Sequence, residues 1–136
     1  MSEVTSIDLE NINIGSSENV SLTVFGNLTL NEYQKRAEST AIYPNLGKNI
    51  YYPTLGLCGE AGEVSEKVKK LMRDHNGILT EDYKLAIAKE LGDVLYYVAM
   101  TSFEIGFSLE EIALLNNEKL SSRKQRNQIQ GSGDNR

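Results

Sequence analysis

The chain has 136 residues, of which 40% are apolar and 24% charged, a composition typical of one ordinary globular domain. Its 14 Lys and Arg against 19 Asp and Glu give a net charge of −5, which argues against broad electrostatic binding of duplex nucleic acid. One cysteine excludes an intramolecular disulfide framework and leaves no zinc-ligand cluster. No run approaches the roughly 20 apolar residues of a membrane span, so we expect a cytoplasmic protein without a membrane partner.

The pattern along the chain divides it into three parts. Residues 1–28 are rich in Ser, Asn and Glu and form an expected N-terminal arm, in which the alternation of Val20, Leu22 and Val24 predicts a short strand. Residues 29–126 are the expected all-α domain, and residues 127–136 are a polar C-terminal tail. The fold class predicted for the domain is a four-helix bundle-like arrangement with short connections.

The first two helices of the domain are separated by Pro and Gly residues. The first is expected from Thr29, which forms a capping box with Glu32, to about residue 40. The second begins near Pro53, which suits the first turn of a helix, and carries apolar side chains at helical spacing as far as residues 74–77.

The third and fourth helices follow the same rules. The third is expected from about residue 80 to residue 103 or 104, with Gly106 as its C-terminal stop. Ser108 and Glu111 form a second capping box, which opens a fourth helix to about residue 126. The third helix is apolar nearly all round and must be buried on every side, so we expect a second subunit to cover part of it, in a homodimer or homotetramer.

Two pairs of carboxylates stand at helical spacing in the second and third helices. Glu60 and Glu63 are neighbours on one face of the second helix, and Glu90 and Asp93 repeat the arrangement on the third. Buried carboxylates are costly unless they are protonated, paired with cations or bound to metal. If the two helices pack antiparallel, the four acids form an all-oxygen site that suits Mg²⁺, with Mn²⁺ as a substitute.

Neighbouring residues support this site and also offer an ordinary alternative. Glu-x-x-Glu occurs on many surface helices, and the spacings Glu63 to Lys67 and Glu66 to Lys70 are those of ordinary surface ion pairs. Glycines beside the acids each cost about 0.5 to 1 kcal/mol inside a helix, so we expect them to permit a close approach of the helices. These glycines are Gly59, Gly62 and Gly92.

The C-terminal segment has the opposite charge to the rest of the chain. From Asn116 onward it holds five basic and two acidic residues, including Lys119 and Arg123. One interpretation is a solvated helix end, where cations favour the C-terminal dipole. The other is a cluster that binds phosphate.

The two acidic motifs together carry a family resemblance. LGLCGEAGEVSEK at residues 55–67, followed by KELGDVLYY at residues 89–97, resembles the MazG-type nucleoside triphosphate pyrophosphohydrolases of the all-α NTP pyrophosphatase superfamily, which also holds dimeric dUTPases and dCTPases. The resemblance covers about residues 28–126. It implies a Mg²⁺-dependent enzyme that cleaves a nucleoside triphosphate between the α and β phosphates, giving the monophosphate and pyrophosphate.

The resemblance also assigns roles to individual residues. Glu60, Glu63, Glu90 and Asp93 match the catalytic metal-binding carboxylates of the family. The segment with Asn116, Lys119 and Arg123 is similar to the one that contacts the substrate phosphates, and the pair Tyr33 and Gln34 resembles the segment that helps hold the nucleotide.

Other classes of protein share parts of this sequence pattern. A di-iron carboxylate bundle requires Glu-x-x-His on two helices, and the only histidine, His75, lies outside both motifs. A non-catalytic helical interaction module needs no chemistry and stays open, as does a dedicated dUTPase or dCTPase within the same superfamily. Substitution of Glu90 or Asp93 separates the interaction module from an enzyme, because only an enzyme loses turnover while its fold persists.

Overall fold

The computed structural model describes residues 28–130, so the predicted strand near residue 22 and most of the arm lie outside the described residues. Four helices occupy the described part: α1 (Leu30–Thr40), α2 (Tyr51–Asp74), α3 (Glu81–Glu104) and α4 (Leu109–Gln125). The predicted all-α class and the four helices are confirmed. None of the described helices is both long and apolar enough to cross a lipid bilayer.

Local capping residues explain where the helices begin. Both predicted capping boxes form, at Thr29 for α1 and at Ser108 for α4. The hydroxyl of Thr80 accepts a hydrogen bond from the backbone of the first turn of α3. Helix α2 begins two residues before Pro53, and its N-cap Ile50 makes no side-chain cap hydrogen bond. The side-chain oxygen of the preceding Asn49 instead accepts a hydrogen bond from the backbone N–H of Tyr52 at 3.2 Å.

Two glycines with positive φ end the long helices. At the end of α2, Gly77 has φ +74° and its N–H donates to the Leu71 carbonyl at 3.1 Å. At the end of α3, Gly106 has φ +78° and donates to the Phe103 carbonyl at 3.0 Å. The left-handed conformation suits glycine in both turns, and it allows the short connections to reverse the chain direction.

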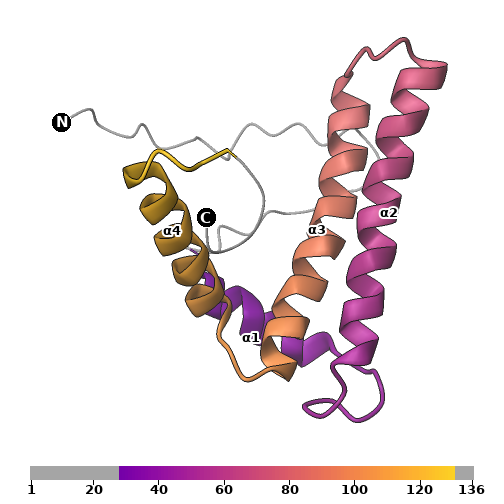
Figure 1. The fold of residues 1–136 in the computed structure, drawn as a ribbon. Coiled ribbons are helices and arrows are strands. Elements are labelled where there is room, and N and C mark those ends of the chain that lie inside the picture. The colour runs from indigo at the N-terminus through magenta and orange to yellow at the C-terminus, as the bar shows by residue number, and fades with distance from the viewer. Residues whose placement is uncertain (1–27, 131–136) are drawn as a thin grey trace.

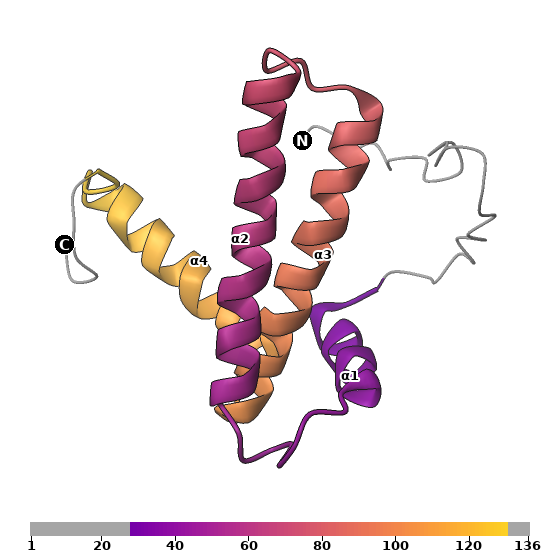
Figure 2. The same cartoon turned by 90° about the vertical axis from the view of Figure 1, so that its right-hand side faces the viewer.

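The longest helices form an antiparallel hairpin. Helices α2 and α3 have 24 residues each and contact each other extensively, and they stand side by side in Figures 1 and 2. Helix α1 packs against α3 and α4, and α4 packs against α3 and α1 but not against α2. Figure 1 shows α1 and α4 near one end of the hairpin, with α4 inclined away from α2. The arrangement is therefore more open than a closed four-helix bundle.

The buried core lies where α1, the C-terminal part of α3 and the start of α4 meet. Its members are Ala37, Tyr43, Ala99, Met100 and Leu109. The rest of α3 packs mainly against α2, and Leu91 and Leu95 on it are 51% and 40% exposed. Within the described chain α3 is thus covered on part of its surface only, and its predicted burial by a second subunit stays a prediction.

Candidate metal and nucleotide site

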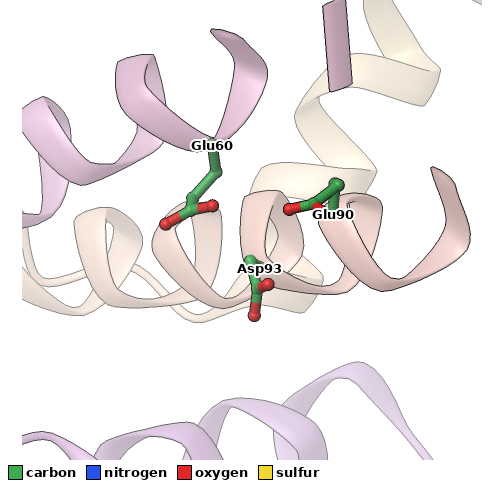
Figure 3. Close-up of side chains that lie close together, drawn as sticks. All are labelled: Glu60, Glu90 and Asp93. Carbon is green, nitrogen blue, oxygen red and sulfur yellow. The ribbon is translucent and has the colours of Figure 1, made fainter. Parts of the chain in front are cut away.

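The hairpin brings acids from two distant segments together. Glu60 on α2 lies beside Glu90 and Asp93 on α3, and each offers a carboxylate oxygen within 4.8 Å of the others. Figure 3 shows Glu60 reaching from its helix toward the other two on the neighbouring helix. Glu60 and Glu90 are partly buried, whereas Asp93 is exposed. Three of the four predicted carboxylates therefore form one group, which we call the acidic cluster.

Glu63 lies one helical turn from Glu60 and is exposed, outside the acidic cluster. Its charge still reaches the cluster. The pKa of Glu60 is raised above its ordinary value, first by partial burial and then by the negative charges of Asp93, Glu90 and Glu63. Repulsion among like charges of this kind is relieved by a cation, so the electrostatics of the cluster favour a metal ion.

The donor set suits a hard divalent ion. Carboxylate oxygens are the ligands that Mg²⁺ and Mn²⁺ prefer. The three acids each offer one such oxygen within 4.8 Å of the other two, so all three could bind one ion. Because Mg²⁺ usually keeps several waters and binds only one or two carboxylates plus substrate phosphates, three acids suffice for such a site. Glu60, Glu90 and Asp93 are thus the residues that fit a metal.

A lysine of α2 also contacts the cluster. The Lys67 ammonium lies 3.2 Å from a carboxylate oxygen of Glu90. The expected surface pair of Lys67 with Glu63 is therefore replaced by an ion pair between the two helices, because the register of α2 on α3 places Glu90 within reach. The other expected pair is confirmed, since Lys70 lies 3.3 Å from Glu66.

The two predicted nucleotide-binding residues on helix α1 have different surroundings. Tyr33 packs against the buried core, and its pKa is raised first by burial and then by the negative charge of Asp93. Gln34 is buried and bound elsewhere: its amide nitrogen donates to the carbonyls of Ala99 and Phe107, and its oxygen accepts from the N–H of Leu109. The structure thus gives Gln34 a structural role, joining α1 to the turn between α3 and α4.

The three predicted phosphate-binding residues lie on α4, apart from the acidic cluster. Asn116 and Lys119 are exposed, whereas Arg123 is 7% exposed. Because α4 has no contact with α2, the chain does not place these side chains beside Glu60. Their role toward phosphate stays a prediction.

The glycine of closest approach is one that sequence reasoning missed. A Cβ placed on Gly59, Gly62 or Gly92 would meet nothing within 4 Å, so the expectation that these three permit contact between helices is wrong for the described chain. A Cβ on Gly56 would instead lie 2.3 Å from the ring of Tyr97. Gly56 lies one helical turn before Glu60, and Tyr97 lies one turn after Asp93, so each shares a helical face with an acid. This shared face is the feature of the sequence that could have predicted their contact.

Comparisons with known proteins agree with the geometry. The family described as "MazG nucleotide pyrophosphohydrolase domain" matches residues 53–127. A protein named Gene 37 protein from Mycobacterium phage L5 is 46% identical over 109 residues, which cover 76% of this chain and 96% of that protein. No solved structure matches the chain significantly. The matched residues include all four acids of the two motifs, and the chain belongs to the MazG nucleotide pyrophosphohydrolase domain family.

Proposed function

We propose that this protein is a Mg²⁺-dependent nucleoside triphosphate pyrophosphohydrolase, which cleaves a ribo- or deoxyribonucleoside triphosphate between the α and β phosphates. The observation that carries the proposal is the acidic cluster, which gathers Glu60, Glu90 and Asp93 within 4.8 Å inside the segment that matches the family. Ordinary surface helices give no reason for acids of two helices to meet, since their mutual repulsion costs stability, and two of these acids, Glu60 and Glu90, are also partly buried.

The reaction follows from the charges of the site. A water oxygen forms a bond to phosphorus while the bond between the α and β phosphates breaks, and the products are the monophosphate and pyrophosphate. A magnesium ion bound at the acidic cluster would supply positive charge against the triphosphate oxygens. Glu60, Glu90 and Asp93 would hold it, and either the metal or a carboxylate that is not engaged by it would activate the attacking water.

The remaining predicted residues have roles around this centre. We assign Lys119 and Arg123 of α4 to the charge that develops on the leaving pyrophosphate, and Asn116 to a phosphate oxygen. Tyr33 is assigned to the nucleotide, and the charge of Asp93, a member of the acidic cluster, acts on its phenol. Glu63 completes the set of metal-binding acids. The net charge of −5 is no obstacle, because the metal and the basic side chains provide a local positive field.

We further propose that the working unit is a homodimer or homotetramer. Several large apolar side chains of the hairpin are exposed in the described chain: Leu55, Val68, Met72, Leu91 and Leu95. Exposed apolar side chains that follow two adjacent helices are typical of a subunit interface. Burial of this surface would also give α3 the apolar surroundings that its composition requires.

A substrate panel tests the reaction. The purified protein is incubated with each common NTP and dNTP plus Mg²⁺, and the products are resolved as monophosphate, pyrophosphate and orthophosphate. We expect monophosphate and pyrophosphate from one or a few substrates, which also identifies the preferred base and sugar. Orthophosphate alone, or no turnover with either Mg²⁺ or Mn²⁺, would contradict the proposal and favour an interaction module.

Two substitutions test the acidic cluster. We expect Glu90→Gln and Asp93→Asn to lower kcat by at least about 100-fold, because each removes a charged metal ligand. Their circular dichroism spectra and thermal midpoints should stay close to those of the unsubstituted protein or rise, since like charges are removed. Glu81→Gln is the matched control, because Glu81 lies on the same helix, is exposed and pairs with Lys84. Equal activity in all three variants would exclude a catalytic role.

A further inference from the structure

The ion pair between Lys67 and Glu90 places a positive charge at the candidate metal site. Lys67 Nζ lies 3.2 Å from a Glu90 carboxylate oxygen, and the two side chains are 36% and 18% exposed. Glu90 is at the same time a member of the acidic cluster, where its carboxylate lies within 4.8 Å of those of Glu60 and Asp93. The ammonium of Lys67 therefore lies on a carboxylate that a divalent ion at the acidic cluster would also use.

We propose that Lys67 is a resident counter-ion of the acidic cluster, which occupies Glu90 in the metal-free protein and must release it when a divalent metal binds. The inference rests on the proposed function, because it assumes that the acidic cluster is the metal site. Its consequence is a lowered affinity for free divalent ions. The nucleotide, whose phosphates supply further oxygen ligands, then becomes the main source of metal affinity.

The physical argument starts from the charges that the cluster must hold without a metal. Three carboxylates within 4.8 Å repel one another, and the pKa of Glu60 is raised first by partial burial and then by this repulsion. One ammonium ion nearby offsets part of the repulsion and keeps the acids in place. The same ammonium repels an incoming cation and has to leave Glu90, so its benefit to the metal-free state is a cost to metal binding.

The side chain of Lys67 can make this exchange. It is partly exposed, and lysine carries its charge on a flexible four-carbon stem. Its neighbours on α2 behave differently: Lys69 and Lys70 both pair with Glu66, which is not a member of the acidic cluster. Among the lysines of α2, the described contacts thus connect Lys67 alone with a carboxylate of the cluster.

The test measures metal binding without nucleotide, so that it does not depend on activity. Mn²⁺ is titrated into the full-length protein, and the free ion is followed by electron paramagnetic resonance. We expect Lys67→Met to bind Mn²⁺ about five- to tenfold more tightly than the unsubstituted protein, which corresponds to about 1 to 1.4 kcal/mol. Lys67→Arg keeps the charge and should retain the weaker affinity. Lys70→Met, which makes the same change in net charge on the same helix, should leave the affinity unchanged.

The outcomes separate the inference from the proposed function. Unchanged or weaker Mn²⁺ binding by Lys67→Met overturns the inference. The inference also fails if neither protein binds Mn²⁺ while the unsubstituted protein hydrolyses nucleotides. If tighter binding appears in Lys67→Met but equally in Lys70→Met, the effect comes from net charge and the inference also fails. Absence of Mn²⁺ binding together with absence of hydrolysis in every protein overturns the proposed function itself. Thermal unfolding of each variant excludes misfolding as the cause.

Discussion

The ring of Tyr97 on α3 lies against the backbone of Gly56 on α2, where a Cβ would come within 2.3 Å of the ring carbon Cε1. Tyr97 follows Asp93 by one helical turn, and Gly56 precedes Glu60 by one turn. The contact therefore sets the approach of the two helices beside the acidic cluster. The pKa of Tyr97 is raised by burial and then by nearby groups that include Glu60, in agreement with this position.

The first prediction concerns this contact. Alanine normally stabilises a helix by about 1 kcal/mol relative to glycine, but overpacking costs about 1 to 3 kcal/mol. We expect Gly56→Ala to destabilise the protein by about 1 kcal/mol, and to stabilise it when Tyr97 is also replaced by Ala. Urea unfolding of the two single variants and the double variant measures this coupling. Gly59→Ala is the control without a clash, and equal effects of Gly56→Ala in both backgrounds would contradict the prediction.

The second prediction separates a structural role of Gln34 from nucleotide binding. Its side chain makes three hydrogen bonds of 2.9 to 3.2 Å to backbone groups of α3, of the turn after it and of α4. Gln34→Leu leaves these buried groups without their partner, so we expect a loss of about 2 to 4 kcal/mol in the free energy of unfolding. Lys35→Ala, at the exposed neighbouring position, should cost much less. An unchanged stability with a raised KM would instead support nucleotide binding.

The third prediction is a dependence of stability on pH through Glu104. One Glu104 oxygen accepts hydrogen bonds from the Tyr43 hydroxyl at 2.6 Å and the Gly47 N–H at 2.9 Å, and the other accepts from the Asn49 N–H at 2.8 Å. Partial burial by itself would raise the pKa of Glu104, but these bonds outweigh it and lower the pKa. The ionised carboxylate thus holds the loop between α1 and α2 against the end of α3.

The sign of the pH effect follows from this lowered pKa. Ionised Glu104 is favoured by folding, so its stabilisation is complete above the ordinary glutamate pKa of about 4.3 and is lost as the pH falls through the lower pKa of the folded protein. We expect Glu104→Gln to cost about 1 to 3 kcal/mol at pH 7 and progressively less at lower pH, as measured by urea unfolding. Tyr43→Phe, which removes one of three donors, should cost less. A difference independent of pH would contradict the assignment.

The fourth prediction concerns assembly. We expect sedimentation equilibrium to give two or four times the chain mass of 15.1 kDa. Leu91→Lys puts a charge at a 51% exposed position of α3 and should shift the protein toward the single-chain mass, because burying an unpaired charge in an interface is costly. Ile42→Lys is the matched control, since Ile42 is 97% exposed and lies in the loop between α1 and α2. A measured mass of 15.1 kDa for the unsubstituted protein would exclude the oligomer.

Local sequence determined the helices and their ends. Thr29 with Glu32, and Ser108 with Glu111, interact within three residues of the chain, so both capping boxes could be predicted without knowledge of the fold. Gly106 likewise ends α3 through its own backbone conformation. The spacing of the acids also placed Glu90 and Asp93 on one helical face, whereas their meeting with Glu60 was predicted only on the condition that the two helices pack antiparallel.

Only the tertiary structure decided which side chains meet across helices. Helical spacing offered Lys67 a partner at Glu63, yet the register of α2 on α3 brought it to Glu90 instead. The choice depends on where two helices contact, which no local pattern encodes. The same reason applies to Gln34, because its buried hydrogen bonds depend on how α1 packs against α3 and α4. It also applies to Gly56, since among the four glycines near the acids it alone would bring a Cβ against a side chain of the other helix.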